Sequence, residues 1–468
     1  MNKRDNSIKY IFVFLLVIQV TYALQIRGVD ISIQNEVEKT GKLFYSTSGD
    51  AVDAINYLAQ SGVNLIRLRI WNNPYDEQGN PYGGGNNNYD VVAALAKRIK
   101  SAGLKFLLDF HYSDFWVDPE KQVKPKAWSS LSVDQLYTAI YEFTVDVLQK
   151  LEANGTPPDY VQTGNEINAE MHKITILQMI DYEDRTRTQA EVVRLFQEKY
   201  PELPPISQGT VSKIEKQFWK RGHVRQLKKN IPNKLSDEQK LDVMLMLEEN
   251  PHTSSRMLFP DGDDSTTAGF KLMTNFLTSA TNAVRQAGLA TTPKIILHLA
   301  NGCDNSMYQW WFKGVVDAGV NFDIIGLSYY PYWHGTLSAL ASNLNDLASR
   351  FQKDLLVVET AYGFTLDNGD SCPNVFGSDQ VSAAGYPATE DGQANFLTDL
   401  KSTLSSAGGG RVLGFVYWEP TWLPGPTWAT QQGMSYISSS GSEGSNWDNQ
   451  ALFDFFGKAL KGVTVFAN

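Results

Sequence analysis

The stretch LKFLLDFHYSD, residues 104–114, joins an apolar run to a polar and aromatic cluster. The run 104–110 has the length and composition of a buried strand, and Asp109, His111 and Tyr112 stand where that strand would end. In a barrel of parallel strands, the carboxyl ends of the strands carry the functional groups. The stretch therefore predicts one strand of a parallel sheet with a site at its end.

The same combination recurs along the chain, and helical patterns lie between the runs. Eight apolar or β-branched runs cover residues 26–32, 64–71, 104–110, 160–164, 294–299, 322–327, 355–358 and 412–417. Apolar residues at three- and four-residue spacing predict helices at 89–102, 133–153 and 306–318. Eight βα units predict the α/β fold class and a (β/α)₈ TIM barrel. A doubly wound sheet is the alternative, but Gly28-Val29-Asp30 is not the glycine-rich turn that such a sheet usually carries after its first strand.

The amino terminus has the pattern of a secretory signal. Lys3, Arg4 and Lys9 precede an apolar run at 10–20, and small residues follow at Thr21 and Ala23. A membrane anchor is the alternative, but the run is shorter than the roughly 20 residues that cross a bilayer. We therefore predict that residues 1–23 are removed and that the protein is secreted, with no membrane contact after cleavage.

Composition limits the partners. The chain of 468 residues carries a formal net charge of −10, which argues against nucleic acid as its main partner. Export would permit a disulfide between Cys303 and Cys372, and two buried thiols are the alternative. We expect a monomer.

Two glutamates end predicted strands and are the candidate catalytic residues. Glu166 follows the fourth run and Glu359 follows the seventh. Hydrolysis of a glycosidic bond needs one carboxylic acid that protonates the departing oxygen and one carboxylate at the anomeric carbon. The spacing predicts a glycoside hydrolase, but it does not say which carboxylate has which task.

Other residues at the strand ends fit a sugar-binding cleft. Asn165 is placed to bind the sugar 2-hydroxyl, and Tyr329 or Tyr330 to bond Glu359 and hold it ionised. Broad aromatic side chains bury the flat faces of sugar rings, although any single one of them could belong to the core. The aromatic residues at or beyond strand ends are Trp71, Trp116, Trp128, Trp333, Trp418 and Trp422.

Long motifs resemble those of glycoside hydrolase family 53, the endo-β-1,4-galactanases. They are GVDIS (28–32), RLRIWNNP (67–74), GGGNN (83–87), DFHYSDFW (109–116), GNEIN (164–168) and SYYP (328–331). The resemblance covers residues 24–169 and 257–468. It implies a retaining endo-hydrolase of the β-1,4-galactan of type I arabinogalactan, with Glu166 as acid/base and Glu359 as nucleophile. The expected substrate-binding residues are Arg69, His111, Asp114, Trp116, Asn165, Tyr329, Trp333 and Trp418.

The sequence departs from the family in the loop after the seventh run. Bacterial members hold calcium there with an Asp-x-Asp-x-His-x-Asn pattern, whereas this chain supplies Asn368, Asp370, Cys372 and Asn374. A thiol is a poor ligand for a hard cation. We therefore expect no metal and no cofactor.

A second departure lies after the fourth run. In the family the motif GNEIN is followed almost directly by MLFPDG. In this chain MLFPDG comes only at residues 257–262. We predict that residues 170–256 form an inserted all-helical module, resembling a transposase helix-turn-helix region, in the loop after strand 4. A family-specific loop excursion and a gene-model error are alternatives.

The insert leaves three functions open. The first is an active galactanase that tolerates the module, and the second is a barrel whose cleft the module distorts. The third is a nucleic-acid-binding protein, suggested by the basic run 213–229, which the predicted secretion opposes.

Overall fold

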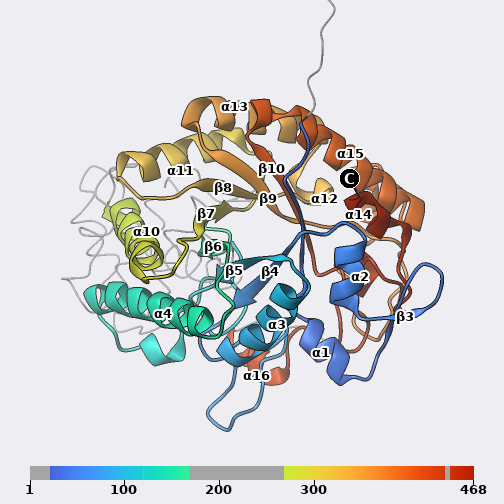
Figure 1. Cartoon of the computed structure of the whole chain (residues 1–468), viewed down its shortest axis with the longest axis horizontal. Coiled ribbons are helices and arrows are strands. Elements are labelled where there is room, and N and C mark those ends of the chain that lie inside the picture. Colours follow the sequence, from blue (N-terminus) through green and yellow to red (C-terminus); the bar gives the residue numbers. More distant parts are fainter. Residues whose placement is uncertain (1–21, 120, 168–267, 438–442, 468) are drawn as a thin grey trace, which may run out of the picture.

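A computed structural model of the chain describes residues 22–119, 121–167, 268–437 and 443–467. Eight parallel strands form a closed barrel in the order β1-β10-β9-β8-β7-β6-β5-β4, so that each strand lies beside its neighbour in the chain (Figure 1). The barrel strands are β1 Ile26–Asp30, β4 Leu65–Ile70, β5 Lys105–Phe110, β6 Tyr160–Thr163, β7 Lys294–Leu299, β8 Ile324–Ser328, β9 Asp354–Thr360 and β10 Val412–Trp418. The predicted TIM barrel is confirmed, and all eight runs lie within about two residues of these strands.

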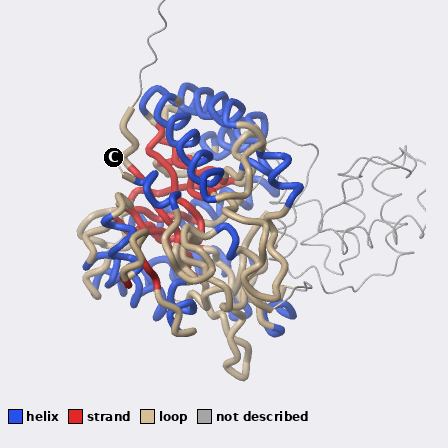
Figure 2. The backbone as a smooth tube through the Cα atoms, turned by 90° about the vertical axis from the view of Figure 1, so that its right-hand side faces the viewer, coloured by secondary structure: helices blue, strands red, loops and turns tan. Residues whose placement is uncertain are grey.

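Helices surround the strands, which occupy the interior of the molecule (Figure 2). Side chains cap several of them: Asn88 accepts from the backbone of Val91, and Ser132 forms a capping box with Gln135. The helices are α1 Gln34–Lys39, α2 Ala54–Gln60, α3 Tyr89–Ser101, α4 Val133–Ala153, α10 Ala268–Gln286, α11 Asn305–Asp317, α12 Pro331–His334, α13 Leu337–Phe351, α14 Ser378–Ala384, α15 Glu390–Ser406 and α16 Gln431–Tyr436.

Short elements complete the described chain. A small hairpin, which the sequence pattern did not predict, pairs β2 Phe44–Tyr45 with β3 Ala51–Val52. Short 3₁₀ helices cover Lys126–Trp128, Gly408–Gly410, Asp448–Gln450 and Lys461–Phe466.

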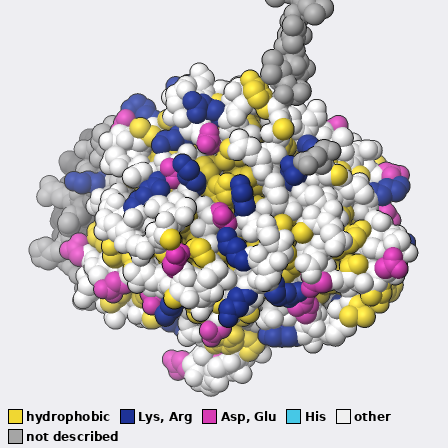
Figure 3. Space-filling model, in the orientation of Figure 1, with side chains coloured by type: hydrophobic (Ala, Val, Ile, Leu, Met, Phe, Trp, Pro, Cys, Tyr) yellow, Lys and Arg dark blue, Asp and Glu magenta, His cyan; other side chains and the backbone are white. Residues whose placement is uncertain are grey.

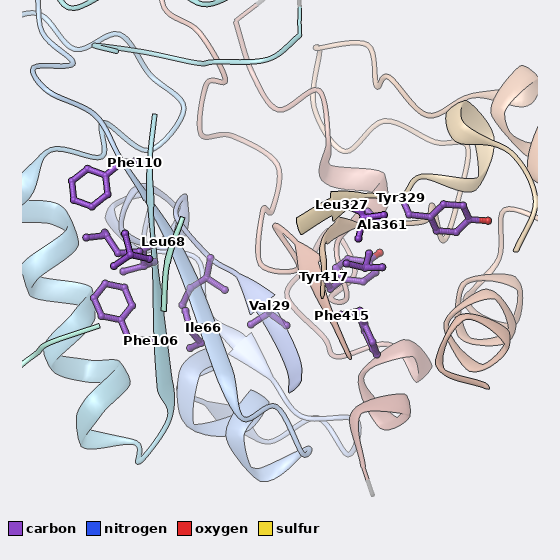
Figure 4. Packing of buried hydrophobic residues seen from close by; sticks show 14 of the residues in the cluster. Val29, Ile66, Leu68, Phe106, Phe110, Leu327, Tyr329, Ala361, Phe415 and Tyr417 are labelled. Carbon is purple, nitrogen blue, oxygen red and sulfur yellow. The ribbon is translucent and has the colours of Figure 1, made fainter. Parts of the chain in front are cut away.

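Alternation along the strands creates two apolar layers. In β4, Leu65 belongs to a cluster inside the barrel, whereas Ile66 and Leu68 pack in the larger cluster that includes the helices (Figure 4). Successive side chains of a strand point to opposite faces, so the intervening Arg67 shares the interior face with Leu65. The apolar interior therefore gives way to charged side chains toward the carboxyl ends of the strands.

Several sequence predictions fall outside the described residues: most of the proposed signal peptide and the whole proposed insert. Among the described helices, none is long and apolar enough to span a membrane. Both cysteines are free, so the structure does not contain the disulfide considered above. Positive and negative side chains are interspersed on the face seen in Figure 3.

Barrel closure predicts a strong effect of substitution at Gly414. This residue of β10 has φ +147°, pairs with Ile26 of β1, and a Cβ atom there would overlap the Ile26 carbonyl oxygen. Gly414→Ala should lower the free energy of unfolding by roughly 3 kcal/mol, because strain and overpacking add. Gly409→Ala is the control, since Gly409 has φ +58° and nothing within 4 Å of its Cβ position. Its cost should be about 1 kcal/mol in the same urea titration, and equal losses would contradict the closure argument.

Candidate active site

A cleft of about 600 Å³ lies at the carboxyl ends of the barrel strands. Both candidate glutamates line it, together with six tryptophans. The lining residues are Arg69, His111, Trp116, Val117, Asp118, Pro119, Lys121, Asn165, Glu166, Ala300, Asn301, Tyr330, Trp333, His334, Glu359, Val375, Trp418, Trp422, Trp428, Ile437, Asn446 and Trp447.

Glu359, near the end of β9, is held by a fully buried guanidinium. Its Oε1 lies 2.9 Å from Nη1 of Arg67, and its Oε2 accepts a 3.3 Å hydrogen bond from the hydroxyl of Tyr330. Arg67 also pairs with Asp30 at 2.9 Å and with Asp109 at 2.7 Å. Both donors bond the charged form of Glu359 and therefore favour a carboxylate there.

Glu166 enters the cleft from a tight turn after β6. Gly164 has φ +86°, and Glu166 itself has φ +49°, a left-handed conformation that is uncommon outside glycine. The turn is anchored to its neighbours: the Gly164 amide donates to Phe110, and the Ile167 amide donates to His298. The hydroxyl of Ser328 donates a 2.5 Å hydrogen bond to Oε1 of Glu166. Strained backbone of this kind is typical of functional positions.

The two carboxyl groups have different electrostatic environments. Burial raises the pKa of Glu166 well above its usual range, and the nearby Glu359 raises it further. Burial also raises the pKa of Glu359, but there the Arg67 guanidinium opposes it. The net effect raises the pKa of Glu359 to about 7. Of the two groups, Glu359 is therefore the more readily ionised and Glu166 the more readily protonated.

Asn165 and His298 lie behind the glutamates. Asn165 accepts from Arg67 at 3.0 Å and donates to the Val117 carbonyl oxygen at 2.8 Å, so its amide orientation is determined. The imidazole of His298 lies 3.0 Å from Asn165 and 2.8 Å from Ser328. Burial and the nearby Arg67 lower the pKa of His298 well below its usual range. This histidine is therefore neutral near pH 7.

Aromatic rings form one side of the cleft. The guanidinium carbon of Arg69 lies 4.3 Å from the Trp116 ring centre, and Arg69 pairs with Glu419 at 2.6 Å. Trp116 stacks on Trp422 with 6.3 Å between the ring centres, and the ring centre of Trp418 lies 5.9 Å from that of Trp116. Flat aromatic surfaces beside two carboxyl groups suit a carbohydrate.

Comparison with known proteins agrees with this geometry. The family model "Glycosyl hydrolase family 53" matches residues 26–200 and 219–466. The chain belongs to this family. The two matched stretches enter the interval 170–256 from both sides, so the proposed limits of the insert stay a prediction.

Relatives and a solved structure support the assignment to family 53. An endo-beta-1,4-galactanase of Bacillus subtilis is 30% identical, over 94% of this chain and 85% of that protein. An arabinogalactan endo-beta-1,4-galactanase of Thermothelomyces thermophilus is 29% identical, over 95% of this chain and 99% of its own length. The family 53 catalytic domain of Ignisphaera aggregans is 34% identical with a TM-score of 0.69, covering 94% and 95% of the two chains.

Most of the predicted site residues of this family 53 barrel line the cleft. In addition to the two glutamates they are Arg69, His111, Trp116, Asn165, Trp333 and Trp418. Trp333 is 51% exposed, which leaves its ring available at the edge of the cleft. The structure thus brings together residues from six different strand ends and their loops.

Two predicted substrate-binding residues do not line the cleft. The Tyr329 ring is fully buried among core residues, and its hydroxyl donates to Gly335 (Figure 4). Tyr330, one residue later, faces the cleft and bonds Glu359, so of the two tyrosines it is the partner. Asp114 is also buried and bonds Asn73 and Lys126, which ties two loops together. Neither the Tyr329 nor the Asp114 side chain therefore faces the cleft in this structure.

Sequence analysis missed the polar residues that support the glutamates. Arg67, Ser328 and His298 all lie in apolar strands, and each is completely buried. A buried charge or hydroxyl in such a strand needs a partner. An arginine inside an otherwise apolar run was therefore a signal that could have been used.

The loop after β9 does not fit a calcium ion. The amide nitrogen of Asn374 donates to Asn368 at 3.0 Å and to Asp448 at 2.7 Å. The carboxylate of Asp370 accepts from the backbone amides of Cys372, Gly425 and Ser445. N–H donors thus occupy the oxygens that a cation would need. Among the described residues, no group of three or more His, Cys, Asp or Glu could hold a metal.

The Arg67 cluster predicts a large loss of stability on its removal. Arg67→Met should lower the free energy of unfolding by about 3–5 kcal/mol, because three buried acidic groups lose their cation. Arg98→Met is the control, since Arg98 also pairs with two carboxylates, Glu38 and Asp53, but at the surface. Its loss should stay below about 1 kcal/mol. Similar losses for both variants in chemical denaturation would show that the buried cluster has no special weight.

Proposed function

We propose that the protein is a secreted, retaining endo-β-1,4-galactanase that acts on the galactan of type I arabinogalactan. The unequal environments of Glu166 and Glu359 in one cleft carry this proposal. The similarity to two galactanases supports galactan as the substrate. The amino-terminal pattern of residues 1–23 supports secretion.

In the first step Glu359 is the nucleophile. Its carboxylate attacks the anomeric carbon, the bond to the departing oxygen breaks, and Glu166 gives its proton to that oxygen. Arg67 and the Tyr330 hydroxyl hold Glu359 ionised before attack. The product is a galactosyl ester of Glu359 and a shortened chain with a new hydroxyl group.

In the second step Glu166 acts as a base. It takes a proton from water, the water oxygen attacks the anomeric carbon, and the ester bond to Glu359 breaks. Two inversions give net retention of the anomeric configuration. Activity should fall at low pH as Glu359 becomes protonated and at high pH as Glu166 loses its proton.

Azide rescue tests the two roles. Glu359→Ala should abolish turnover of an activated aryl β-galactoside, and azide should restore part of it with an α-galactosyl azide as product, because azide replaces the nucleophile directly. Glu166→Ala should give the β-galactosyl azide, because azide then attacks the galactosyl ester. The anomer is identified by proton NMR, and exchanged anomers would reverse the assignment.

A deletion tests whether residues 170–256 are compatible with activity. The full chain and a version lacking 170–256 are assayed on pectic β-1,4-galactan at equal concentrations of folded protein. We expect both to release reducing ends at rates within about tenfold, because loop-closure entropy changes slowly with loop length. Activity of the deletion alone would show an inhibitory segment, and inactivity of both would contradict the proposed function.

A further inference from the structure

A chain of buried polar groups leads from the β7 strand to Glu166. His298 on β7 and Ser328 at the end of β8 are both fully buried. Nε2 of His298 lies 2.8 Å from the Ser328 hydroxyl, and that hydroxyl donates to Oε1 of Glu166. The proposed proton donor therefore has a hydrogen-bonded support from β7 and β8.

The direction of each hydrogen bond in this chain follows from a backbone amide. The Glu166 N–H points at Nδ1 of His298 over 3.4 Å, and the side-chain amide of Gln162 lies 3.0 Å from the same atom. The Asn165 side-chain oxygen also lies 3.0 Å from Nδ1, but this oxygen already accepts from Arg67 and Gln162. A backbone amide always donates, so we assign the lone pair to Nδ1. The proton of a neutral imidazole is then on Nε2. His298 donates to Ser328, whose single hydrogen is thereby directed to Glu166.

We propose that His298 and Ser328 are positioning residues that reserve Oε1 of Glu166 as an acceptor and so place its transferable proton on Oε2. The proposal rests on the proposed role of Glu166 as acid/base. Since Oε1 already receives the hydrogen of Ser328, a proton on Oε1 would oppose that hydrogen. The carboxyl proton is thus localised on one oxygen before the glycosidic bond breaks.

The same hydrogen bond has a second consequence. When Glu166 has given up its proton, Ser328 continues to donate to the resulting carboxylate, and a hydrogen bond to the charged form lowers the pKa of a buried acid. This limits the rise that burial imposes on the pKa of Glu166. The acid can then release its proton in one step and take one from water in the next.

Ionisable groups from several elements surround Glu166 and His298. Glu166 faces the ionisable groups of Arg67, Asp118, Tyr308, Tyr330 and Glu359. The His298 imidazole faces Arg67, His111 and His334. Burial, the Arg67 cation and the two histidines all oppose a charged imidazole. His298 therefore remains neutral through the range in which Glu166 titrates.

The tautomer is testable without measuring activity. The full chain with ¹⁵N-labelled histidine is studied by proton–nitrogen correlation through two bonds, and the His298 signal is the one that disappears in His298→Gln. We expect a neutral imidazole with the proton on Nε2 from pH 5 to pH 9. A signal that titrates near pH 6.5, or a proton on Nδ1, overturns the proposal.

A matched pair of variants tests the effect on the reaction. Glutamine places an amide near the Nε2 position and asparagine near the Nδ1 position. His298→Gln should therefore keep the donor to Ser328 and stay within about threefold of wild-type kcat on galactan. His298→Asn should lose about 10- to 100-fold, the worth of one charge-assisted hydrogen bond. A role limited to holding the turn through Nδ1 predicts the opposite order and would overturn the proposal.

Ser328→Ala gives an independent measurement. Removing the donor should lower kcat by about 10- to 100-fold with KM changed less than threefold, and should move the alkaline limb of the kcat profile upward by about one pH unit. Ser328→Thr keeps a hydroxyl and should restore the profile. An unmoved limb in Ser328→Ala contradicts the proposal. Glu166→Gln separates the two hypotheses: if it leaves the alkaline limb in place, the acid/base assignment has failed, whereas the tautomer experiment still tests the hydrogen-bond chain.

Discussion

A single buried cation organises the catalytic end of this barrel. The Arg67 guanidinium has no exposed surface and contacts three acidic side chains, Asp30 from β1, Asp109 from β5 and Glu359 from β9. Three carboxylates this close would repel one another without it, and Glu359 would lose the charge that opposes its protonation. The same contacts that link strands across the barrel therefore favour the ionised form of Glu359. Stability and chemistry depend here on one side chain.

A second layer repeats this arrangement closer to the cleft. Arg69 pairs with Glu419 and lies against the Trp116 ring, so the charge of one arginine fixes the position of an aromatic surface. Glu419, like Glu166, has a left-handed backbone with φ +53°. Both glutamates therefore stand at turns that only strong local contacts can maintain. The ion pair at Glu419 and the hydrogen bonds around Glu166 are those contacts.

The barrel was predictable because each buried strand appears in the sequence as a short apolar run. The two glutamates were predictable because each closely follows such a run. Side-chain direction at the strand ends was not predictable. Tyr329 and Tyr330 are neighbours, and a difference of one residue exchanges the core for the cleft. The roles of His298 and Ser328 depend on pairing across strands distant in sequence, which periodicity does not encode. Asp114 is similar, since its partner Lys126 belongs to another part of the loop.

The contacts that hold Glu166 also bear on the junction with residues 168–267. Its carboxyl group is bonded from β8 by Ser328, and its own amide points to His298 on β7. The next residue, Ile167, donates its amide to the His298 carbonyl oxygen at 2.9 Å. Each of these anchors comes from the barrel, so they fix the chain up to Ile167. The geometry that the proton donor needs is therefore specified before the chain reaches the proposed insert, and a long excursion that begins after this anchor does not by itself displace the acid.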